Sequence, residues 1–251
     1  MSEFLTDFRP GLFAGKTVLV SGGTSGIGLE IARGFSRLGA TTFTTGSSAE
    51  KLALCREQTE DSKIHFRQLD ITLPSQVAAL MTDLPELDVL INAAGIARPG
   101  SEYEEETFLK VMDINLNSVM RLSQSAMPKL LESRGCIVNV ASMLSYLADA
   151  LVPAYCASKS GVTGLTRALA HRYGPQGVRI NAVAPGYHQT EMTRPLWSDP
   201  DAAEHIRNRT ALKRWGRADD LTGAVLFLCS SAAQYITGVT LPVDGGYVSG
   251  M

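Results

Sequence analysis

Three side chains between Ser142 and Lys159 carry groups that can exchange a proton: a serine hydroxyl, the phenol of Tyr155 and a lysine ammonium. Pro153 suits the first turn of a helix, where its missing N–H costs nothing, so Tyr155 and Lys159 are predicted one helical turn apart on one face. A free phenol has a pKa of about 10 and is a poor base at neutral pH, whereas a fixed cation nearby stabilises the phenolate. We expect Lys159 to supply that cation and to lower the pKa of Tyr155.

The serine follows an apolar run, residues 136–141, that predicts a buried strand ending at Ser142. In open α/β sheets, ligands bind outside the carboxyl ends of the strands. The hydroxyl is therefore expected at a ligand site. This context favours catalysis over the alternative in which Tyr155 packs under a loop and Lys159 is solvated.

A second motif, residues 21–28 with glycines at Gly22, Gly23, Gly26 and Gly28, separates a β-branched apolar run from an amphipathic segment. Glycines allow close backbone approach, and a helix N-terminus offers unpaired N–H groups and partial positive charge to a pyrophosphate. A tight turn without a ligand is the alternative reading of such glycines. The order strand, glycine turn, helix favours a dinucleotide site.

The elements that must position these motifs alternate along the chain. Strands are expected near residues 16–20, 41–45, 64–69, 87–91, 136–141, 178–184 and 239–243, and helices near 29–38, from 49, after 74, and over 103–132, 153–173 and 219–230. Repeated β-then-α order implies an α/β fold, a Rossmann-type doubly wound parallel sheet of about seven strands with helices on both faces.

Length and composition favour one domain over residues 1–251, with 45% hydrophobic residues and a formal net charge of −2. This charge argues against nucleic-acid and membrane partners. The four cysteines are scattered, so neither a disulfide framework nor a metal site is predicted. Residues 1–14 lack the pattern of a signal peptide, and polar residues interrupt the uncharged stretch 221–243, so we expect a cytoplasmic protein without a membrane span.

Residues 187–215 form a connection too long for this fold class and are predicted to be an irregular substrate lid. Five cations and no acid lie within residues 205–218, namely Arg207, Arg209, Lys213, Arg214 and Arg217. They favour an anionic ligand or an acidic neighbouring subunit. A solvated helix face with ion pairs elsewhere is the alternative.

Over residues 13–251 the sequence resembles the short-chain dehydrogenase/reductase family. The glycine turn is similar to the family's Thr-Gly-x-x-x-Gly-x-Gly, with Ser21 in place of threonine, and Ser142, Tyr155 and Lys159 match its catalytic positions. The sequence Asn92-Ala93-Ala94-Gly95 resembles the family's Asn-Asn-Ala-Gly but lacks the second asparagine and the backbone-bracing hydrogen bond that it makes. The turn Asp244-Gly245-Gly246 resembles a C-terminal turn of the family.

The resemblance implies hydride exchange between a secondary alcohol and a nicotinamide, whose chemistry belongs to the cofactor. In this scheme Tyr155 moves the hydroxyl proton, Ser142 bonds to the substrate oxygen, Lys159 also binds the ribose, and Asn115 anchors a water that passes the proton to solvent. Asp70 would accept from the adenine amino group and Thr190 would bond to the carboxamide. The implied cofactor-binding residues are Gly22, Thr24, Ser25, Gly26, Ile27, Gly28, Ser47, Asp70, Ile71, Asn92, Ala93, Gly95, Tyr155, Lys159, Pro185, Gly186 and Thr190.

The choice of dinucleotide depends on the end of the second predicted strand, where residues 45–48 offer neither the acid usual for NAD nor the arginine usual for NADP. A neutral ribose hydroxyl can bond to Ser47, whereas a phosphate without a fixed cation would be held poorly. This favours NAD. NADP is the alternative if Lys51 or Arg37 reaches the site.

Several stretches, residues 142–145, 152–155, 185–187 and 209–216, resemble the sugar-acid oxidoreductases of the family, such as 2-deoxygluconate 3-dehydrogenase and gluconate 5-dehydrogenase. They imply a small polar or anionic hydroxy compound as substrate. A 3-oxoacyl thioester reductase is the alternative within the family, and a non-catalytic dinucleotide-binding regulator is the alternative outside it. The resemblance also implies a homotetramer that packs through residues 103–132 and 152–173.

Overall fold

The fold is built on one parallel sheet of seven strands in the order β3-β2-β1-β4-β5-β6-β9. The computed structural model describes residues 3–59 and 61–250, so both ends of the predicted domain 1–251 lie outside the described residues. The predicted doubly wound sheet is confirmed. The strands are β1 Thr17–Ser21, β2 Thr41–Gly46, β3 Ile64–Gln68, β4 Val89–Asn92, β5 Cys136–Val140, β6 Arg179–Pro185 and β9 Thr240–Val243.

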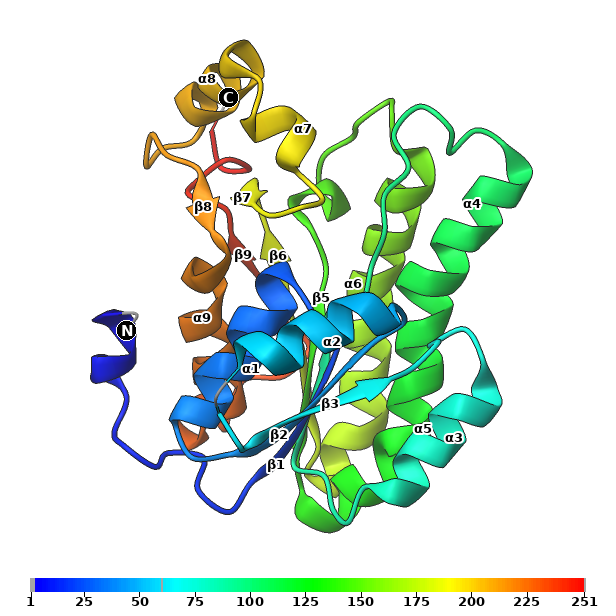
Figure 1. Cartoon of the computed structure of the whole chain (residues 1–251), viewed down its shortest axis with the longest axis vertical. Coiled ribbons are helices and arrows are strands. Elements are labelled where there is room, and N and C mark those ends of the chain that lie inside the picture. Colours follow the sequence, from blue (N-terminus) through cyan, green and yellow to red (C-terminus); the bar gives the residue numbers. More distant parts are fainter. Residues whose placement is uncertain (1–2, 60, 251) are drawn as a thin grey trace.

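Helices cover both faces of the sheet (Figure 1). On one face lie α1 and α9, with α2 at the β2–β3 edge, and on the other lie α3, α5 and α6. The bounds are α1 Gly26–Arg37, α2 Ala49–Gln58, α3 Pro74–Asp83, α4 Glu105–Met112, α5 Ser118–Ser133, α6 Pro153–Tyr173, α7 Arg194–Trp197, α8 Pro200–Arg209 and α9 Thr222–Cys229.

The central strand β1 is buried along its whole length because its alternate side chains enter two different cores. Val18 and Val20 pack in the cluster that contains Phe35 of α1. Leu19 packs in the opposite cluster with Leu122 of α5. Strands covered on both faces read as continuous apolar runs, which explains why the sequence pattern located them.

The strand order reverses at β1, whose neighbours β2 and β4 lead to opposite sides of the sheet. The loops that follow β1 and β4 therefore diverge at their carboxyl ends and leave a crevice between them. The glycine turn follows β1, and the segment that begins with Ala93 follows β4. The topology thus brings the two predicted cofactor motifs together.

One helix was predicted over residues 103–132, and the observed helix differs from it in its start and in its regularity. It begins at Glu105 and contains a π-helical turn, Asp113–Asn117, between α4 and α5, with an i→i+5 bond from the Ser118 amide to the Asp113 carbonyl. A π turn shifts the register by one residue over a single turn, which is too short to disturb the hydrophobic periodicity. Such turns are frequent at functional sites, and Asn115 lies within this one.

The prediction that residues 187–215 are irregular was wrong. They contain β7 His188–Gln189, α7 and α8, and β7 pairs in parallel with β8 Gly216–Arg217. The Asp199 side chain caps α8 by accepting a hydrogen bond from the Ala202 amide at 2.9 Å. Asp followed by Pro is a helix-start signal. Figure 1 shows α7 and α8 standing together beyond the carboxyl ends of the strands.

The uncharged stretch 221–243 folds as α9 and β9, as predicted. No helix within residues 3–59 and 61–250 is long and apolar enough to cross a membrane.

Candidate active site

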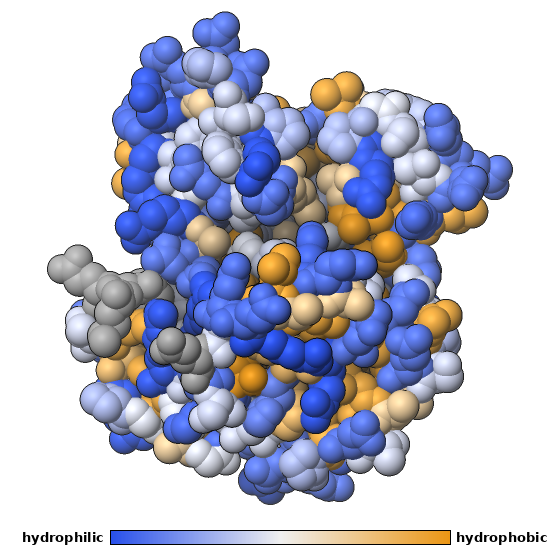
Figure 2. Space-filling model, viewed as in Figure 1, coloured by the Kyte–Doolittle hydropathy of each residue, from blue (hydrophilic) through white to orange (hydrophobic). Residues whose placement is uncertain are grey.

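A cavity of about 380 Å³ opens at the carboxyl ends of the strands, and it receives nearly all of the predicted site residues. Figure 2 shows the molecular surface hollowed between the largely hydrophilic α7–α8 lobe and the lobe that contains α4. The predicted residues that line the cavity are Gly22, Thr24, Ser25, Gly26, Ile27, Gly28, Ser47, Asp70, Ile71, Ala93, Gly95, Ser142, Tyr155, Lys159, Pro185, Gly186 and Thr190.

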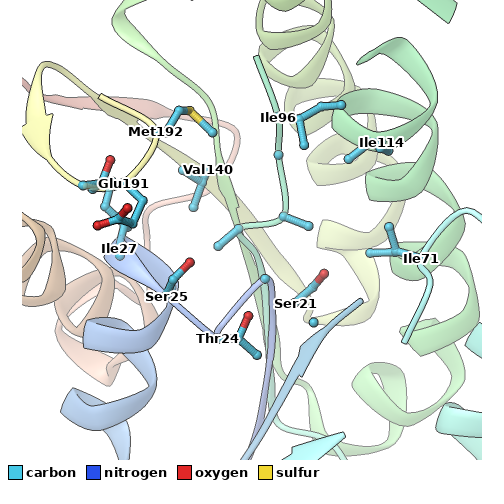
Figure 3. Close-up of a pocket in the computed structure, with 18 of the residues that line it drawn as sticks. Ser21, Thr24, Ser25, Ile27, Ile71, Ile96, Ile114, Val140, Glu191 and Met192 are labelled. Atoms are coloured by element: carbon cyan, nitrogen blue, oxygen red, sulfur yellow. The ribbon is translucent and has the colours of Figure 1, made fainter. Parts of the chain in front are cut away.

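The glycine turn forms the floor of one end of the cavity, where Figure 3 shows Thr24 and Ser25 below the opening. Gly22 has φ +77°, and a Cβ built there would lie 2.6 Å from the Ala94 backbone, so only glycine fits between β1 and β4. The helix α1 begins at Gly26, earlier than predicted, and the Ser25 side chain does not cap it. Its first N–H groups are therefore available to an anion such as a pyrophosphate.

Tyr155 and Lys159 lie on one face of α6, as predicted, because Pro153 starts that helix. The Lys159 Nζ lies 5.6 Å from the centroid of the Tyr155 ring and donates a hydrogen bond of 2.7 Å to the Val140 carbonyl at the end of β5. Lys159 is 4% exposed, and burial lowers its pKa to about 8. The ammonium is thus held between the strand end and the phenol.

The expectation that the phenol would already be acidic was wrong for the protein alone. Burial raises the pKa of Tyr155 above its ordinary value, and a hydrogen bond with the Ser142 side chain opposes this rise. The phenol is therefore protonated at neutral pH. A protonated tyrosine beside a serine hydroxyl is arranged to donate a proton to an oxygen bound between them.

Ser142 lies just beyond β5, as predicted, and is 6% exposed. Its Oγ accepts a hydrogen bond from the Leu144 amide at 3.1 Å and so caps the short 3₁₀ turn Met143–Ser145. This fixes the serine rotamer, and the hydroxyl hydrogen can still be donated, either to the Tyr155 phenol or to a ligand in the cavity.

Asn115 does not line the cavity, although it lies behind the Gly95 wall. Its Oδ1 accepts from the Ile96 amide at 2.8 Å, and its Nδ2 donates to the Ile96 carbonyl at 2.9 Å and to the Ser158 hydroxyl at 3.2 Å. The side-chain amide is therefore engaged in hydrogen bonds within the protein. What Asn115 holds is the backbone of Ile96, which lines the cavity.

Asn92, which was predicted to bind the cofactor, does not line the cavity. The side chain is 2% exposed, and its Nδ2 donates to Asn139 Oδ1 at 2.8 Å and to Ser123 Oγ at 3.2 Å. Asn92 and Asn139 are register partners on neighbouring strands. Parallel register directs both side chains to the same face, so Asn92 braces the sheet beneath the site.

Ala93, which replaces the family's second asparagine, still braces the backbone after β4, because its amide donates to the Ser21 carbonyl at 2.9 Å. The strand ladder thus continues one residue past β4. The ends of β1 and β4 therefore remain hydrogen-bonded although Ala93 has no asparagine side chain.

Asp70 lies at the cavity beyond β3, and its Oδ1 accepts from both the amide and the hydroxyl of Thr72. These bonds lower the pKa of the carboxyl, which is ionised at neutral pH. One carboxylate oxygen is occupied by the local turn, so Oδ2 is the atom available to a ligand.

Thr190 closes the cavity from the side opposite the glycine turn. Its Cγ2 lies 3.3 Å from the position of a Cβ on Gly26, and its hydroxyl lies 3.2 Å from that of Thr193. Figure 3 shows the neighbouring Glu191 and Met192 on the loop across the cavity from Ser21. The loop after β6 therefore overlies the predicted pyrophosphate position.

The basic side chains of residues 205–218 do not line this cavity. Three of them form ion pairs with acids that flank the stretch, Arg207 with Glu204, Arg214 with Asp220 and Arg217 with Asp219, and Arg209 lies 4.4 Å from the centroid of the Tyr247 ring. The alternative of ion-paired side chains therefore holds for these three arginines, and the basic stretch gives no evidence for an anionic substrate.

Several lining residues were not predicted from the sequence, including Ser48, Ile96, Ile114, His188, Glu191, Met192 and Thr193. Most of them are sequence neighbours of predicted residues, and this closeness in the sequence is what could have identified them. Lys51, which was considered for NADP, also lines the cavity. Lys51 and Ile114 reach the cavity through helix geometry. Across the described part of the chain, no cluster of three or more His, Cys, Asp or Glu side chains could hold a metal ion.

Comparison with known proteins places this geometry in a family. A family model described as enoyl-(acyl carrier protein) reductase matches residues 22–248. The chain is 38% identical to 2-dehydro-3-deoxy-D-gluconate 5-dehydrogenase of Bacillus subtilis, over 94% of this chain and 95% of that protein. It is 37% identical to gluconate 5-dehydrogenase of Gluconobacter oxydans, over 95% and 97%. The 3-oxoacyl-[acyl-carrier-protein] reductase of Rickettsia typhi is 35% identical, over 93% and 97%.

Comparison with solved structures leads to the same family. A gluconate 5-dehydrogenase from Burkholderia cenocepacia, in complex with NADP and tartrate, superimposes with a TM-score of 0.89 at 32% identity, covering 95% of this chain and 97% of that chain. A Beutenbergia cavernae structure with NADP at low occupancy, provisionally assigned as an NAD(P)-dependent gluconate 5-dehydrogenase, gives 0.87 at 36% identity, covering 96% and 100%. The chain therefore belongs to the short-chain dehydrogenase/reductase family and is an NAD(P)-dependent oxidoreductase that interconverts a secondary alcohol and a ketone.

Proposed function

We propose that the protein interconverts a hydroxyl and a keto group of a sugar acid, with NADP as the cofactor. The observation that carries the reaction is the convergence of Ser142, Tyr155 and Lys159 at one end of the cavity. The sugar-acid substrate is supported by the two dehydrogenases that match this chain at 38% and 37% identity over nearly its full length.

Tyr155 is the acid and base in this proposal. Its phenol is protonated at neutral pH, and burial raises its pKa further; it donates a proton to the substrate oxygen in reduction and takes it back in oxidation. Ser142 donates a hydrogen bond to the same oxygen, where negative charge develops. Bound NADP supplies or accepts the hydride.

Lys159 keeps positive charge beside the phenol. Its hydrogen bond to the Val140 carbonyl fixes the ammonium, and the charge stabilises the phenolate that forms in the reaction. For Asn115 we propose a positioning role in place of a proton relay, because its amide holds the Ile96 backbone that forms the cavity wall.

The residues present fit a dinucleotide. The uncapped N-terminus of α1 can hold a pyrophosphate, the glycine turn leaves no room for side chains, and Asp70 keeps one oxygen free for an adenine amino group. The glycine turn and α1 follow β1, and Asp70 follows β3, two strands away in the sheet order β3-β2-β1.

The preference between the two dinucleotides turns on Lys51. The neutral side chains that favoured NAD, Ser47 and Ser48, do line the cavity, but Lys51 lines it too from the first turn of α2. An ammonium beside two hydroxyls can hold a ribose phosphate. NADP is also the dinucleotide in the two solved relatives, so we propose NADP in place of NAD.

The cofactor proposal is tested by titrating NADPH and NADH into wild type and into Lys51→Ala. NADPH should bind tighter to wild type, and Lys51→Ala should weaken NADPH binding about tenfold through loss of a charge-assisted bond while NADH binding is unchanged. Lys63→Ala, which removes an exposed lysine ahead of β3, is the control. Equal affinities of wild type for the two dinucleotides would contradict the proposal.

The substrate proposal is tested with a panel that contains gluconate, its keto derivatives, other hydroxy acids, polyols and an acetoacetyl thioester, followed by nicotinamide absorbance. The highest kcat/KM should belong to a sugar acid. Ile96 and Met192, both apolar, line the cavity and would also suit a 3-oxoacyl thioester, the rival reading supported by the Rickettsia relative. Preference for the thioester would replace the sugar acid.

The role of Tyr155 is tested by Tyr155→Phe, which removes only the reacting hydroxyl. Turnover should fall at least 10³-fold, in line with loss of a proton-transfer group, while NADPH affinity changes less than about twofold, because the ring and its packing remain. Turnover close to wild type would contradict the mechanism.

We further propose that residues 187–215 act as a lid, that the protein is a homotetramer and that it works in the cytoplasm. The loop that carries Glu191 and Met192 overlies the cavity and supports the lid. Exposed Leu109 of α4 and Met120 of α5, and the open face of Gly164 on α6, support packing between copies. Four free cysteines suit a reducing compartment.

A further inference from the structure

Glu102 is a completely buried carboxylate, 0% exposed, in the turn ahead of α4. Within the described residues no cation forms an ion pair with it. Its oxygens accept two backbone hydrogen bonds instead, Oε1 from the Arg98 amide and Oε2 from the Tyr155 amide, each at 2.8 Å. A buried charge without a counter-ion is costly unless strong hydrogen bonds compensate for it, so these two bonds are what keeps it there.

The bond to Tyr155 supplies a cap that α6 lacks. A helix leaves its first N–H groups without partners, and a Ser, Thr, Asp or Asn at the N-cap usually accepts one of them. The N-cap of α6 is Val152, which has no side-chain acceptor, and Pro153 follows it. Glu102 therefore caps the helix from a segment about fifty positions away, at the residue that carries the phenol, and its negative charge also suits the helix N-terminus.

The other bond ties the same carboxylate to the cavity wall. The segment that runs from Ile96 to Glu102 is held at its start by Asn115, which bonds both the amide and the carbonyl of Ile96. Its middle is held by the Gly100 amide, which donates to the Leu151 carbonyl at 2.9 Å. Glu102 then joins the Arg98 amide of this segment to α6.

We propose that Glu102 is a positioning residue that fixes the first turn of α6, and with it the Tyr155 phenol, relative to the substrate wall at Ile96. This rests on the proposed role of Tyr155. The phenol extends from the residue whose amide Glu102 binds, so a small shift of that turn moves the reacting oxygen, and a misplacement of about 1 Å costs about 100-fold in rate.

The charge of Glu102 gives a second, electrostatic signature. The groups around the phenol are Glu102 and Cys156, which raise its pKa, the Ser142 hydroxyl, which lowers it, and the Lys159 ammonium near the ring. Replacing Glu102 by a neutral residue lowers the pKa of Tyr155. Oxidation needs the phenolate, so the rise of its rate with pH should move to lower pH.

The experiment compares Glu102→Gln with Glu104→Gln, an exposed acid of the same turn whose side chain caps nothing. Glu102→Gln keeps the shape but can satisfy only one of the two amides, so kcat should fall about 10- to 100-fold with cofactor KM within twofold, and the oxidation profile should shift to lower pH. Hydrogen exchange at the Tyr155 amide should become faster. Glu104→Gln should match wild type in all four measurements.

Glu102→Asp separates shape from charge. It is one methylene shorter and keeps the charge, so kcat should fall while the pH profile stays at the wild-type position, and this variant carries the test if Glu102→Gln is unstable at the assay temperature. A wild-type kcat and pH profile in Glu102→Gln would overturn the inference. Failure of the proposed function gives a different result, because the Tyr155→Phe variant would then turn over substrate at the wild-type rate.

Discussion

Lys159 is a charged side chain held almost entirely away from water. Its ammonium is 4% exposed and has a backbone carbonyl, not a carboxylate, as its hydrogen-bond acceptor. Burial lowers its pKa from an ordinary 10.5 to about 8, which corresponds to about 3 kcal/mol of destabilisation while the group is charged. The buried Lys159 ammonium therefore destabilises the folded protein, as is common for functional groups at active sites.

Replacing this lysine should therefore stabilise the protein. Lys159→Met should raise the free energy of unfolding by about 1–3 kcal/mol at pH 7 and abolish turnover. The folded protein binds fewer protons than the unfolded chain between pH 8 and 10.5, so wild type gains stability as pH rises through that window, and the advantage of the variant should shrink. Urea unfolding at pH 7 and pH 9.5 measures this.

The matched control for that prediction is Lys110→Met, which removes an exposed lysine of α4. It should change neither unfolding free energy nor turnover appreciably. A Lys159→Met variant less stable than wild type at pH 7 would show that the carbonyl bond outweighs the burial of the charge.

In the proposed mechanism, ketone reduction needs the phenol and the ammonium both protonated, so the pKa of Lys159 should set its pH dependence. The reduction rate should be constant at low pH and fall as pH rises through about 8, where Lys159 loses its proton. Lys159→Arg keeps its charge to much higher pH and should move the fall upward. A fall that stays at the same pH in Lys159→Arg would assign it to another group.

Among the elements, the segment 187–215 is the one built most independently of the sheet. Trp197 and Trp215 are the two tryptophans of the chain, and both lie in it. Trp197 Nε1 donates to the Thr190 carbonyl at 2.9 Å, and Trp215 Nε1 donates to the Ala203 carbonyl at 3.0 Å. Intrinsic tryptophan fluorescence therefore reports on this segment alone.

If the segment closes over ligands, its fluorescence should change when NADPH and then a sugar acid are added. Trp197 should carry most of the change, because it is tied to Thr190, which lines the cavity, whereas the Trp215 ring packs against Tyr187. Trp197→Phe should abolish the response and Trp215→Phe should leave it. Equal responses from both variants would contradict this division.

At the scale of the whole molecule, the proposed tetramer makes a mutational prediction. Light scattering should give a mass four times the 26.9 kDa of the chain. Met120→Glu in α5 should lower that mass, because it places a charge at an apolar surface position 40% exposed in one chain. Leu54→Glu in α2, at a position of similar exposure on another side of the molecule, should not.

Much of the fold could be predicted because its determinants are local. The buried strands β1, β4 and β5 are mostly apolar runs, glycine at Gly22 is required by a positive φ and a close backbone contact, and Pro153 marks the start of α6. Each of these signals is contained within a few residues. The family motifs then predicted from the sequence that Ser142, Tyr155 and Lys159 lie in one site.

Four features did not follow from the sequence patterns and were decided by the tertiary structure. The acids that pair with the basic stretch lie just beyond it, the π turn leaves the hydrophobic pattern unchanged, the raised pKa of Tyr155 comes from burial, and Glu102 bonds to an amide fifty positions away. The sequence by itself determined which groups could react. Their protonation and placement were decided by desolvation and by hydrogen bonds between segments far apart in the chain, which no local pattern encodes.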